Sequence, residues 1–151
     1  MTNAELKEFL VSRVQNAVVT DGPQYVTAQI PAESWLEAAQ ELKQNASTAF
    51  DYLFCLSGVD MPDHLMVVYH LESTTYRHAM VVKVKTNDRI QAQIPSVAGI
   101  WPTANFHERE AFDLLGIKFT GHPDLRRFFM DDDQGHPLRK DYKDENRIVE
   151  R

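Results

Sequence analysis

Three strand-length runs in the middle of the chain limit the folds that it can adopt. The runs cover residues 52–59, 65–72 and 78–85, and short turn-forming segments separate them. Each run is rich in branched and aromatic residues, which favour strands. Successive strands at such short spacing pair most simply as an antiparallel meander. We therefore expect these residues to form the centre of a sheet.

Two helical patterns and one further strand precede the meander. Residues 4–19 carry apolar side chains at helical spacing behind a suitable capping residue, Thr2 or Asn3. Residues 25–30 are strand formers, and residues 31–45 open with a proline and keep their apolar side chains on one face. This order predicts a two-layer α+β domain, with the helices on one face of a mixed, largely antiparallel sheet. The other face is left to solvent or to a partner.

The last third of the chain combines one more helical pattern with a charged tail. Residues 103–115 form the helical pattern, and Gly116 is a natural left-handed stop. Beyond Gly121 the sequence is rich in charge, proline and glycine, so it buries little apolar surface by itself. We predict an α+β domain over residues 1–120 and an extended C-terminal arm over residues 121–151.

Composition excludes several classes of function. The net charge of −6 supplies no basic field for nucleic acid. No apolar run approaches the roughly 20 residues that span a bilayer, and the start of the chain does not resemble a signal peptide, which indicates a cytoplasmic protein. Cys55 is the single cysteine, and we expect it to be a buried apolar residue. One thiol cannot build a disulfide, a zinc ribbon or an iron–sulfur site.

A His-Glu pair at the start of the segment 107–113 invites comparison with a metalloprotease helix. Such a helix needs a second histidine four residues after His107, and that position is Ala111. The comparison therefore fails.

The charged residues of the same segment are interpreted as a salt-bridged, solvated helix face. Arg109 and Asp113 are helical neighbours that can pair. Glu108 and Glu110 point in different directions, and no nucleophile accompanies them, so acid–base catalysis is not favoured.

A Gly-His-Pro sequence at residues 121–123 recurs at residues 135–137. Each copy is followed by a leucine and two cations, and an acidic run at 131–133 lies between the copies. The acidic run lacks the spacing of a calcium loop. Glycine and proline favour turns and extended chain, so this segment must be ordered by a surface that it lies against, and we expect the free arm to be mobile. Mixed charge favours a protein partner over a phosphate or a lipid surface.

The ordered set of fixed residues from Glu108 to Arg127, followed by residues 135–142, resembles a family signature. It is similar to that of the 30 kDa (C-type) subunit family of NADH:quinone oxidoreductase, which is respiratory complex I. The matching motifs cover roughly a third of the chain, and the linker at 128–134 departs from the usual pattern at Asp133-Gln134.

The resemblance implies a non-catalytic structural and assembly subunit in the peripheral arm of a proton-translocating enzyme that moves electrons from NADH to quinone. It implies association with the large quinone-site (D-type) subunit and with iron–sulfur subunits. The protein itself would hold no cofactor, metal or catalytic residue, while the parent complex would use NAD, FMN, iron–sulfur clusters and quinone. Location is expected on the cytoplasmic side of the bacterial inner membrane, with membrane association only through the complex.

The resemblance also supplies the candidate residues for the partner interface and for ordering the arm. They are Glu108, Arg109, Glu110, Asp113, His122, Asp124, Arg126, Arg127, His136, Arg139, Lys140 and Asp141.

Three alternatives stay open at this point. The chain could be the equivalent subunit of a related membrane-bound hydrogenase or of a ferredoxin- or deazaflavin-linked dehydrogenase. It could be a stand-alone enzyme using His107 and Glu110, although no nucleophile motif, phosphate loop or dinucleotide fingerprint supports this. It could also be a free adaptor that binds acidic ligands through its arginines.

Overall fold

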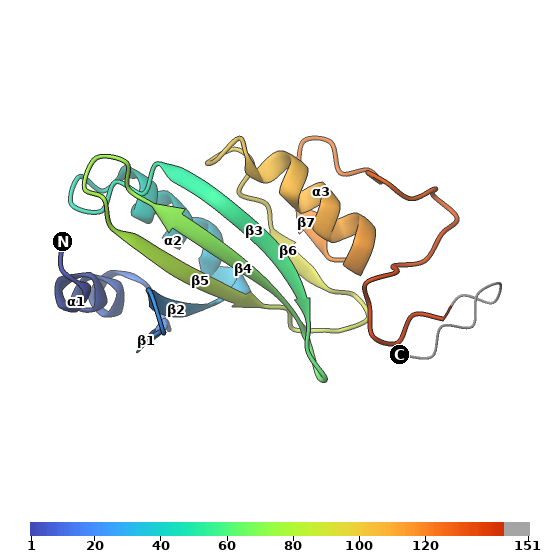
Figure 1. Ribbon diagram of the computed structural model, residues 1–151, viewed down its shortest axis with the longest axis horizontal. Helices are drawn as coiled ribbons and strands as arrows, with labels where there is room; N and C mark the ends of the chain where they lie inside the picture. Colours follow the sequence, from blue (N-terminus) through green and yellow to red (C-terminus); the bar gives the residue numbers. More distant parts are fainter. Residues whose placement is uncertain (144–151) are drawn as a thin grey trace.

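The computed structural model describes residues 1–143 of the chain (Figure 1). Its elements, in chain order, are α1 (Asn3–Arg13), β1 (Val18–Asp21), β2 (Val26–Pro31), α2 (Ala32–Gln44), β3 (Tyr52–Asp60), β4 (Leu65–Glu72), β5 (Ala79–Lys85), β6 (Gln93–Pro95), α3 (Ala104–Leu115) and β7 (Lys118–Thr120).

Five of the strands form one mixed sheet in the order β1-β2-β5-β4-β3. The predicted meander is confirmed, because β3 pairs with β4 and β4 pairs with β5, both antiparallel. β2 enters beside β5 in the parallel direction, and β1 closes the edge as an antiparallel neighbour of β2. A separate parallel pair, β6 and β7, was not predicted, since strands this short carry no periodic signal.

The first helix is shorter than predicted. Thr2 caps α1 through a capping box with Glu5, but the helix ends at Arg13 instead of continuing to residue 19. Val14 adopts an extended conformation, and Asn16 has a positive φ of 58°, which turns the chain back. The apolar residues Val18 and Val19 then belong to β1, where the helical spacing of the sequence was misleading.

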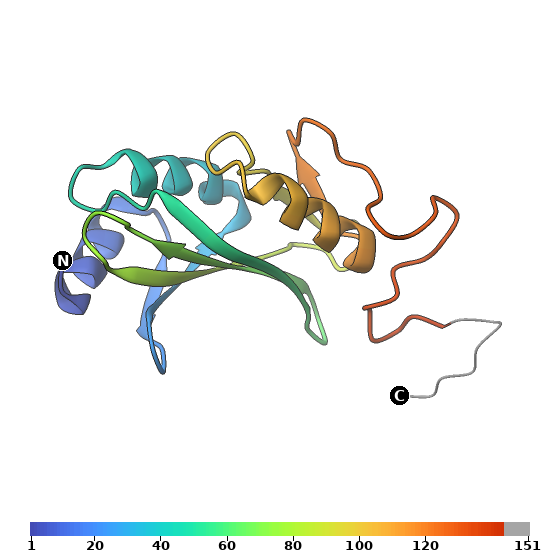
Figure 2. The same ribbon diagram turned by 45° about the horizontal axis from the view of Figure 1, so that its top comes forward.

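All three helices contribute to one core on a single face of the sheet, as predicted. Figure 2 shows α2 and α3 on the same side of the strands. Along β2 and β4 every second residue is buried, as a sheet with one covered face requires. The core centres on Trp35, Tyr69 and Trp101, and Trp35 lies 4.6 Å from the Tyr69 ring and 6.3 Å from the Trp101 ring between centroids.

The opposite face of the sheet is left open, and Cys55 lies on it. The register between β3 and β4 shifts between Leu53 and Cys55, which marks a β-bulge. Because of the bulge, neither Phe54 nor Cys55 is buried in the core. Cys55 is half-buried and lies opposite His70 of β4. The expectation of a buried cysteine is therefore wrong.

α3 packs closely against β3 and so fixes the position of the last third of the chain. Gly58 of β3 faces this helix, and a Cβ atom at Gly58 would lie 2.3 Å from Cδ1 of Leu115. Ala111 and Leu115 are buried at the same contact. A glycine is therefore required here for close packing.

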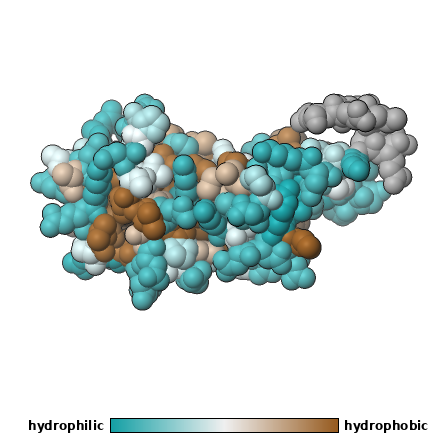
Figure 3. Space-filling view, turned by 90° about the horizontal axis from the view of Figure 1, so that it is seen from below, coloured by the Kyte–Doolittle hydropathy of each residue, from teal (hydrophilic) through white to brown (hydrophobic). Residues whose placement is uncertain are grey.

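The surface of the described part is largely hydrophilic. Seen from below, it carries a compact hydrophobic patch toward the end of the molecule where α1 and β1 lie (Figure 3). Val11 of α1 and Val18 of β1 are among the exposed apolar residues. Across residues 1–143 no helix has the length and apolar character needed to cross a membrane.

The contact between Gly58 and α3 leads to a stability prediction. Gly58→Ala should lower the free energy of unfolding by about 1–3 kcal/mol, because the new methyl group displaces the buried Leu115 side chain. Gly99→Ala is the matched control, since a Cβ there meets no atom within 4 Å, and its effect should stay within about 0.5 kcal/mol. Urea unfolding measures both, and equal stability of the two variants would contradict the packing argument.

Candidate partner-binding arm

Residues 121–143, here called the arm, leave β7 and pass around the C-terminal end of α3 (Figure 1). They contain turns and bends but no helix or strand. The polar groups of such a segment need partners from elsewhere in the chain or from solvent. Three groups of contacts with the domain supply them, and the first centres on Asp113.

The carboxylate of Asp113 is fully buried at the end of α3 and binds the arm at three points. Arg127 donates from Nε to Oδ1 at 2.5 Å, and the backbone amides of Phe129 and Met130 donate to Oδ2 at 2.6 and 3.1 Å. Burial by itself would raise the pKa of Asp113, but these hydrogen bonds outweigh it and hold the pKa below its ordinary value. Asp113 is therefore an ionised anchor at neutral pH.

Arg127 also binds a later part of the arm. Its Nη1 donates to the carbonyl of Gln134 and its Nη2 to that of Gly135, both at 2.8 Å. The planar guanidinium thus joins the helix to two segments of the arm, the one around Arg127 and the one around Gly135, here called its two limbs. This pairing also corrects the predicted pair within the helix, because Asp113 binds Arg127 instead of Arg109.

The second Gly-His-Pro copy forms the next group of contacts, over the stop of α3. His136 Nδ1 lies 2.9 Å from the carbonyl oxygen of Asp113, and Arg139 Nε donates to the carbonyl of Leu115 at 2.6 Å. Gly116 has a φ of 75°, and a Cβ there would lie 2.6 Å from His136 Cδ2. Glycine is therefore needed both for the turn and for the approach of the histidine.

The third group of contacts holds the far end of the arm against β3. Asp60, at the end of β3, forms an ion pair with Arg89 and accepts a hydrogen bond from the Lys140 amide at 2.7 Å. Asp141 lies 3.7 Å from the same arginine. Asp60 and Arg89 were not predicted, because each is an isolated charge in a loop or at a strand end, far from the motif in sequence.

Glu108 lies on the face of α3 toward the core and has only neutral hydrogen-bond donors. Ser96 Oγ donates to it at 2.6 Å and the Val97 amide at 2.8 Å. His122 Nε2 is 3.8 Å away, beyond hydrogen-bond distance, and lies 3.0 Å from the Asn105 carbonyl oxygen instead. Burial raises the pKa of Glu108 to about 7, although the bonds from Ser96 and Val97 oppose the rise.

The predicted solvated face of α3 is therefore wrong for three of its four charges. Glu108, Arg109 and Asp113 are buried, and only Glu110 is exposed. Helical periodicity could not reveal this, since the partners that cover the charges come from the arm and from the loop at Ser96. Asp124 and Arg126 form an exposed ion pair of 3.0 Å.

Most of the twelve predicted residues gather around α3, and the assignment of any of them to a partner interface stays a prediction. Seven lie at α3 and at the arm contacts around it: Glu108, Arg109, Asp113, His122, Arg127, His136 and Arg139. Two, Lys140 and Asp141, lie at Asp60 and Arg89. Glu110, Asp124 and Arg126 lie at the surface.

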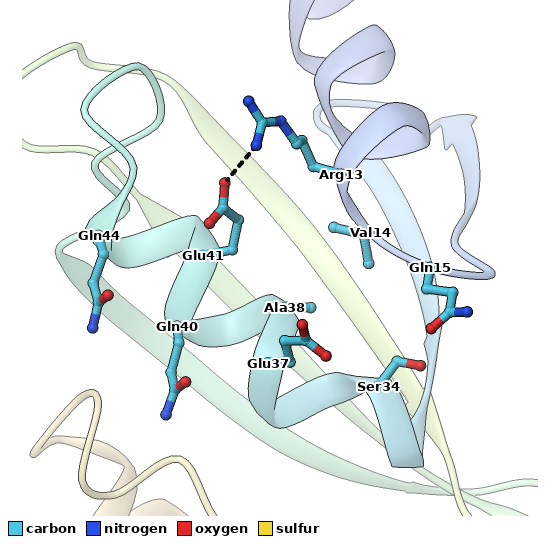
Figure 4. Close-up of a pocket in the computed structure, with 9 residues that line it drawn as sticks. All are labelled: Arg13, Val14, Gln15, Ser34, Glu37, Ala38, Gln40, Glu41 and Gln44. Carbon is cyan, nitrogen blue, oxygen red and sulfur yellow. Dashed lines mark ion pairs between the residues drawn. The ribbon is translucent and has the colours of Figure 1, made fainter.

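The hollow between α1 and α2 is not connected with these residues. It has a volume of about 360 Å³, and Figure 4 shows the Arg13 and Glu41 side chains meeting across it, 4.0 Å apart. Its lining is polar and open to solvent, unlike the enclosed apolar sites that bind cofactors. Within residues 1–143 no three metal-ligating side chains lie close enough together to hold an ion.

The buried Glu108 predicts a pH dependence of stability. The unfolded chain releases this proton near pH 4.5 and the folded chain near pH 7, so the folded state binds more protons between these values. The free energy of unfolding should therefore fall by about 3 kcal/mol as pH rises through this window. Urea unfolding should show a much flatter profile for Glu108→Gln, and identical profiles for the two proteins would contradict the assignment.

The anchor at Asp113 predicts a local change in hydrogen exchange. Asp113→Asn removes the charge that accepts the Phe129 and Met130 amides, so these two amides should exchange roughly ten- to a hundredfold faster. Asp124→Asn is the control, because within residues 1–143 this exposed side chain pairs with Arg126 alone, and the change should leave both amides unchanged. Equal protection in all three proteins would show that the carboxylate does not hold the arm.

Sequence comparison relates this chain to subunits of respiratory enzymes. Residues 28–147 match the family model of the respiratory-chain NADH dehydrogenase, 30 Kd subunit. The C-type subunit of NADH-quinone oxidoreductase from Moorella thermoacetica is 43% identical over 128 residues, covering 83% of this chain and 84% of that protein. The C-type subunit from Chloroherpeton thalassium is 48% identical over 114 residues, covering 74% of this chain. The C/D-type subunit from Phocaeicola vulgatus is 47% identical over 116 residues, covering 76% of this chain.

The chain spans about half the length of the Chloroherpeton protein (47%) and about a fifth of the Phocaeicola protein (22%). Among solved structures, a trypsin-resistant fragment of Nqo5 superposes with a TM-score of 0.69 at 28% identity, covering 82% of this chain and all of the fragment. A chain of an archaeal membrane-bound sulfane sulfur reductase superposes with a TM-score of 0.79 at 23% identity, covering 95% of this chain and 86% of that chain. The chain therefore belongs to the family of the 30 kDa (C-type) subunit of NADH-quinone oxidoreductase.

Proposed function

We propose that this chain is a structural and assembly subunit of the peripheral arm of a proton-translocating NADH:quinone oxidoreductase, without catalytic residues of its own. The observation that carries the proposal is the anchored arm. Ion pairs and backbone hydrogen bonds hold it around α3, while Arg126, Phe128 and Phe129 face outward. The expected mobile free arm stays a prediction, but the surface that the arm lies against is that of its own domain. Exposed side chains on a segment held in this way suit recognition of a protein surface, because little ordering entropy is lost on binding.

The redox groups of the enzyme are proposed to lie in other subunits. NAD, FMN, the iron–sulfur clusters and quinone belong to the parent complex in this proposal. Cys55 offers one thiol to a cluster that normally needs four, and it lies on the open face of the sheet. The chain would thus support electron transfer from NADH to quinone by holding its neighbours in place.

The large quinone-site (D-type) subunit is the proposed direct partner. The Phocaeicola relative, whose name joins the C and D types, carries a region 47% identical to this chain within one longer polypeptide. This supports a close association of the two proteins. Iron–sulfur subunits are proposed as further neighbours. The complex would hold the chain peripherally on the cytoplasmic side of the bacterial inner membrane.

The equivalent subunit of a related membrane-bound complex is the second candidate function. The archaeal sulfane sulfur reductase shares the fold, and at 23% identity the likeness shows no more than that. The electron donor distinguishes the two candidates. Membranes with the assembled complex should oxidise NADH, and oxidation of reduced ferredoxin without oxidation of NADH would favour the second candidate.

Arg127 holds the arm in place through Asp113, whereas Arg126 is exposed and can contact a partner. Variants of these two residues therefore test the two roles separately. Arg127→Ala leaves the buried Asp113 carboxylate unpaired, at a cost of about 3 kcal/mol, and should strongly reduce recovery of the large quinone-site subunit. Arg126→Ala removes an exposed pair with Asp124 and leaves the anchor at Asp113 intact, so it should reduce the recovery less than Arg127→Ala, through the loss of a surface contact alone. Affinity purification from detergent-solubilised membranes, followed by mass spectrometry and an NADH-oxidation assay, measures both variants.

The wild-type chain provides the reference in the same experiment. It should bring down the large quinone-site subunit and the iron–sulfur subunits with NADH-oxidation activity. Recovery of the wild-type chain alone would refute the structural-subunit proposal and would favour the free adaptor.

A further inference from the structure

An exposed aromatic patch lies where the arm crosses α3. Phe106 of α3 is 59% exposed, and Phe128 and Phe129 of the arm are 40% and 67% exposed. The Phe106 and Phe128 rings lie 6.2 Å apart and the Phe128 and Phe129 rings 4.4 Å apart, between centroids. These three residues, here called the aromatic patch, form one continuous apolar surface beside polar chain. Such a surface marks an interaction site when it belongs to a protein of an assembly.

Arg109 lies beneath this patch and is the least well paired charge of the region. Only 8% of its surface is exposed, and its guanidinium carbon lies 5.0 Å from the Phe128 ring centroid and 5.9 Å from that of Phe106. Its hydrogen bonds run to the carbonyls of Arg126 and Arg127 at 3.5 and 3.3 Å, from Nε and Nη2. Both bonds are longer than usual, and neither acceptor carries a charge.

The nearby carboxylates do not compensate this cation. Asp113 binds Arg127, and Asp124 binds Arg126. Among the residues that the structure describes, no carboxylate oxygen lies within 4.0 Å of the Arg109 guanidinium. Nη1 of Arg109 makes no hydrogen bond to this part of the chain. Nη1 is therefore a donor without a partner in this part of the chain, and cation–π contacts supply only part of the stabilisation that a counter-charge would give.

A partner segment with an acidic and an apolar side chain would suit both the unpaired Arg109 guanidinium and the aromatic patch. A carboxylate would pair with Nη1 of Arg109, and an apolar side chain next to it would cover the aromatic patch. We propose that Arg109 and the aromatic patch form a recognition site for a segment of the large quinone-site subunit that carries an acidic residue beside an apolar one. This inference rests on the proposed association with that protein and names the chemistry of the contact.

The alternative of a basic segment is less well supported by the geometry. Glu110 is the anion beside the patch, and it is exposed, so water already solvates it. Arg109 is buried, so its charge gains more from a partner of opposite sign. The sign of the partner charge therefore follows from the difference in burial between these two neighbours.

Binding of the large quinone-site subunit to charge variants tests the sign directly. Arg109→Gln should weaken the affinity on the order of thirtyfold, the usual scale for a central interface arginine. Arg109→Lys keeps the charge without the planar fork and should fall between Arg109→Gln and the wild type. Glu110→Gln is the matched control: an acidic partner segment predicts unchanged or tighter binding, and weakening as large as that of Arg109→Gln would overturn the proposal.

A photo-crosslinking experiment keeps Arg109 in place and so does not depend on how its variants fold. A benzophenone amino acid replaces Phe129 in the assembled complex, and Tyr52 on β3, 47% exposed, serves as the control position. We expect the crosslink from position 129, and not that from position 52, to reach a peptide of the large quinone-site subunit with an Asp or Glu within a few residues. Crosslinks confined to this chain, or to a peptide of the partner without such an acid, would overturn the inference.

The two proposals fail in different ways in this experiment. A complex that still contains the large quinone-site subunit, with crosslinks elsewhere, refutes the recognition site and leaves the structural role standing. A wild-type chain that does not recover this partner refutes the structural role and the recognition site together.

Discussion

The ionised carboxylate of Asp113 is the interaction on which the shape of the last third of the molecule depends. A chain without helix or strand must still find partners for its backbone amides and carbonyls. Asp113 accepts two of these amides and the Arg127 guanidinium, and the guanidinium in turn binds the carbonyls of Gln134 and Gly135. One buried charge thus fixes both limbs of the arm, and its own burial is tolerable only because the arm surrounds it with donors.

The arm also satisfies the end of the helix on which it is anchored. The last carbonyls of an α-helix have no partners within the helix and carry its negative dipole. In α3 the carbonyls of Asp113, Leu114 and Leu115 are met by His136, by the Leu138 amide and by Arg139. No basic residue lies in the last turn of α3 itself, so the cations that complement its dipole come from the arm: Arg127 donates to the Asp113 carbonyl at 3.3 Å and Arg139 to the Leu115 carbonyl. The helix and the arm therefore stabilise each other.

The sequence predicted the elements with long, regular patterns and missed those set by distant contacts. The α+β class, the meander and the helix before Gly116 follow from periodicity that is local to each segment. The end of α1 at Arg13 was missed because Val18 and Val19 fit a helical stripe as well as an edge strand. The motif residues were found as a set, but the burial of Glu108 and the pairing of Asp113 depend on chain far away in sequence. The predicted arm extends to residue 151, and its last part, residues 144–151, lies outside the described residues.

The three buried charges of α3 have different partners, and the difference indicates which of them stabilise the fold and which is available to a partner protein. Asp113 is paired with a cation of the arm, so its charge is used to shape the protein. Glu108 meets only neutral donors, and burial without a counter-charge moves its pKa toward neutrality. A guanidinium, such as that of Arg109, cannot become neutral in the same way. Among the described residues, Arg109 is thus the buried charge of α3 that an external carboxylate would stabilise most, and the exposed rings beside it give the same partner an apolar contact.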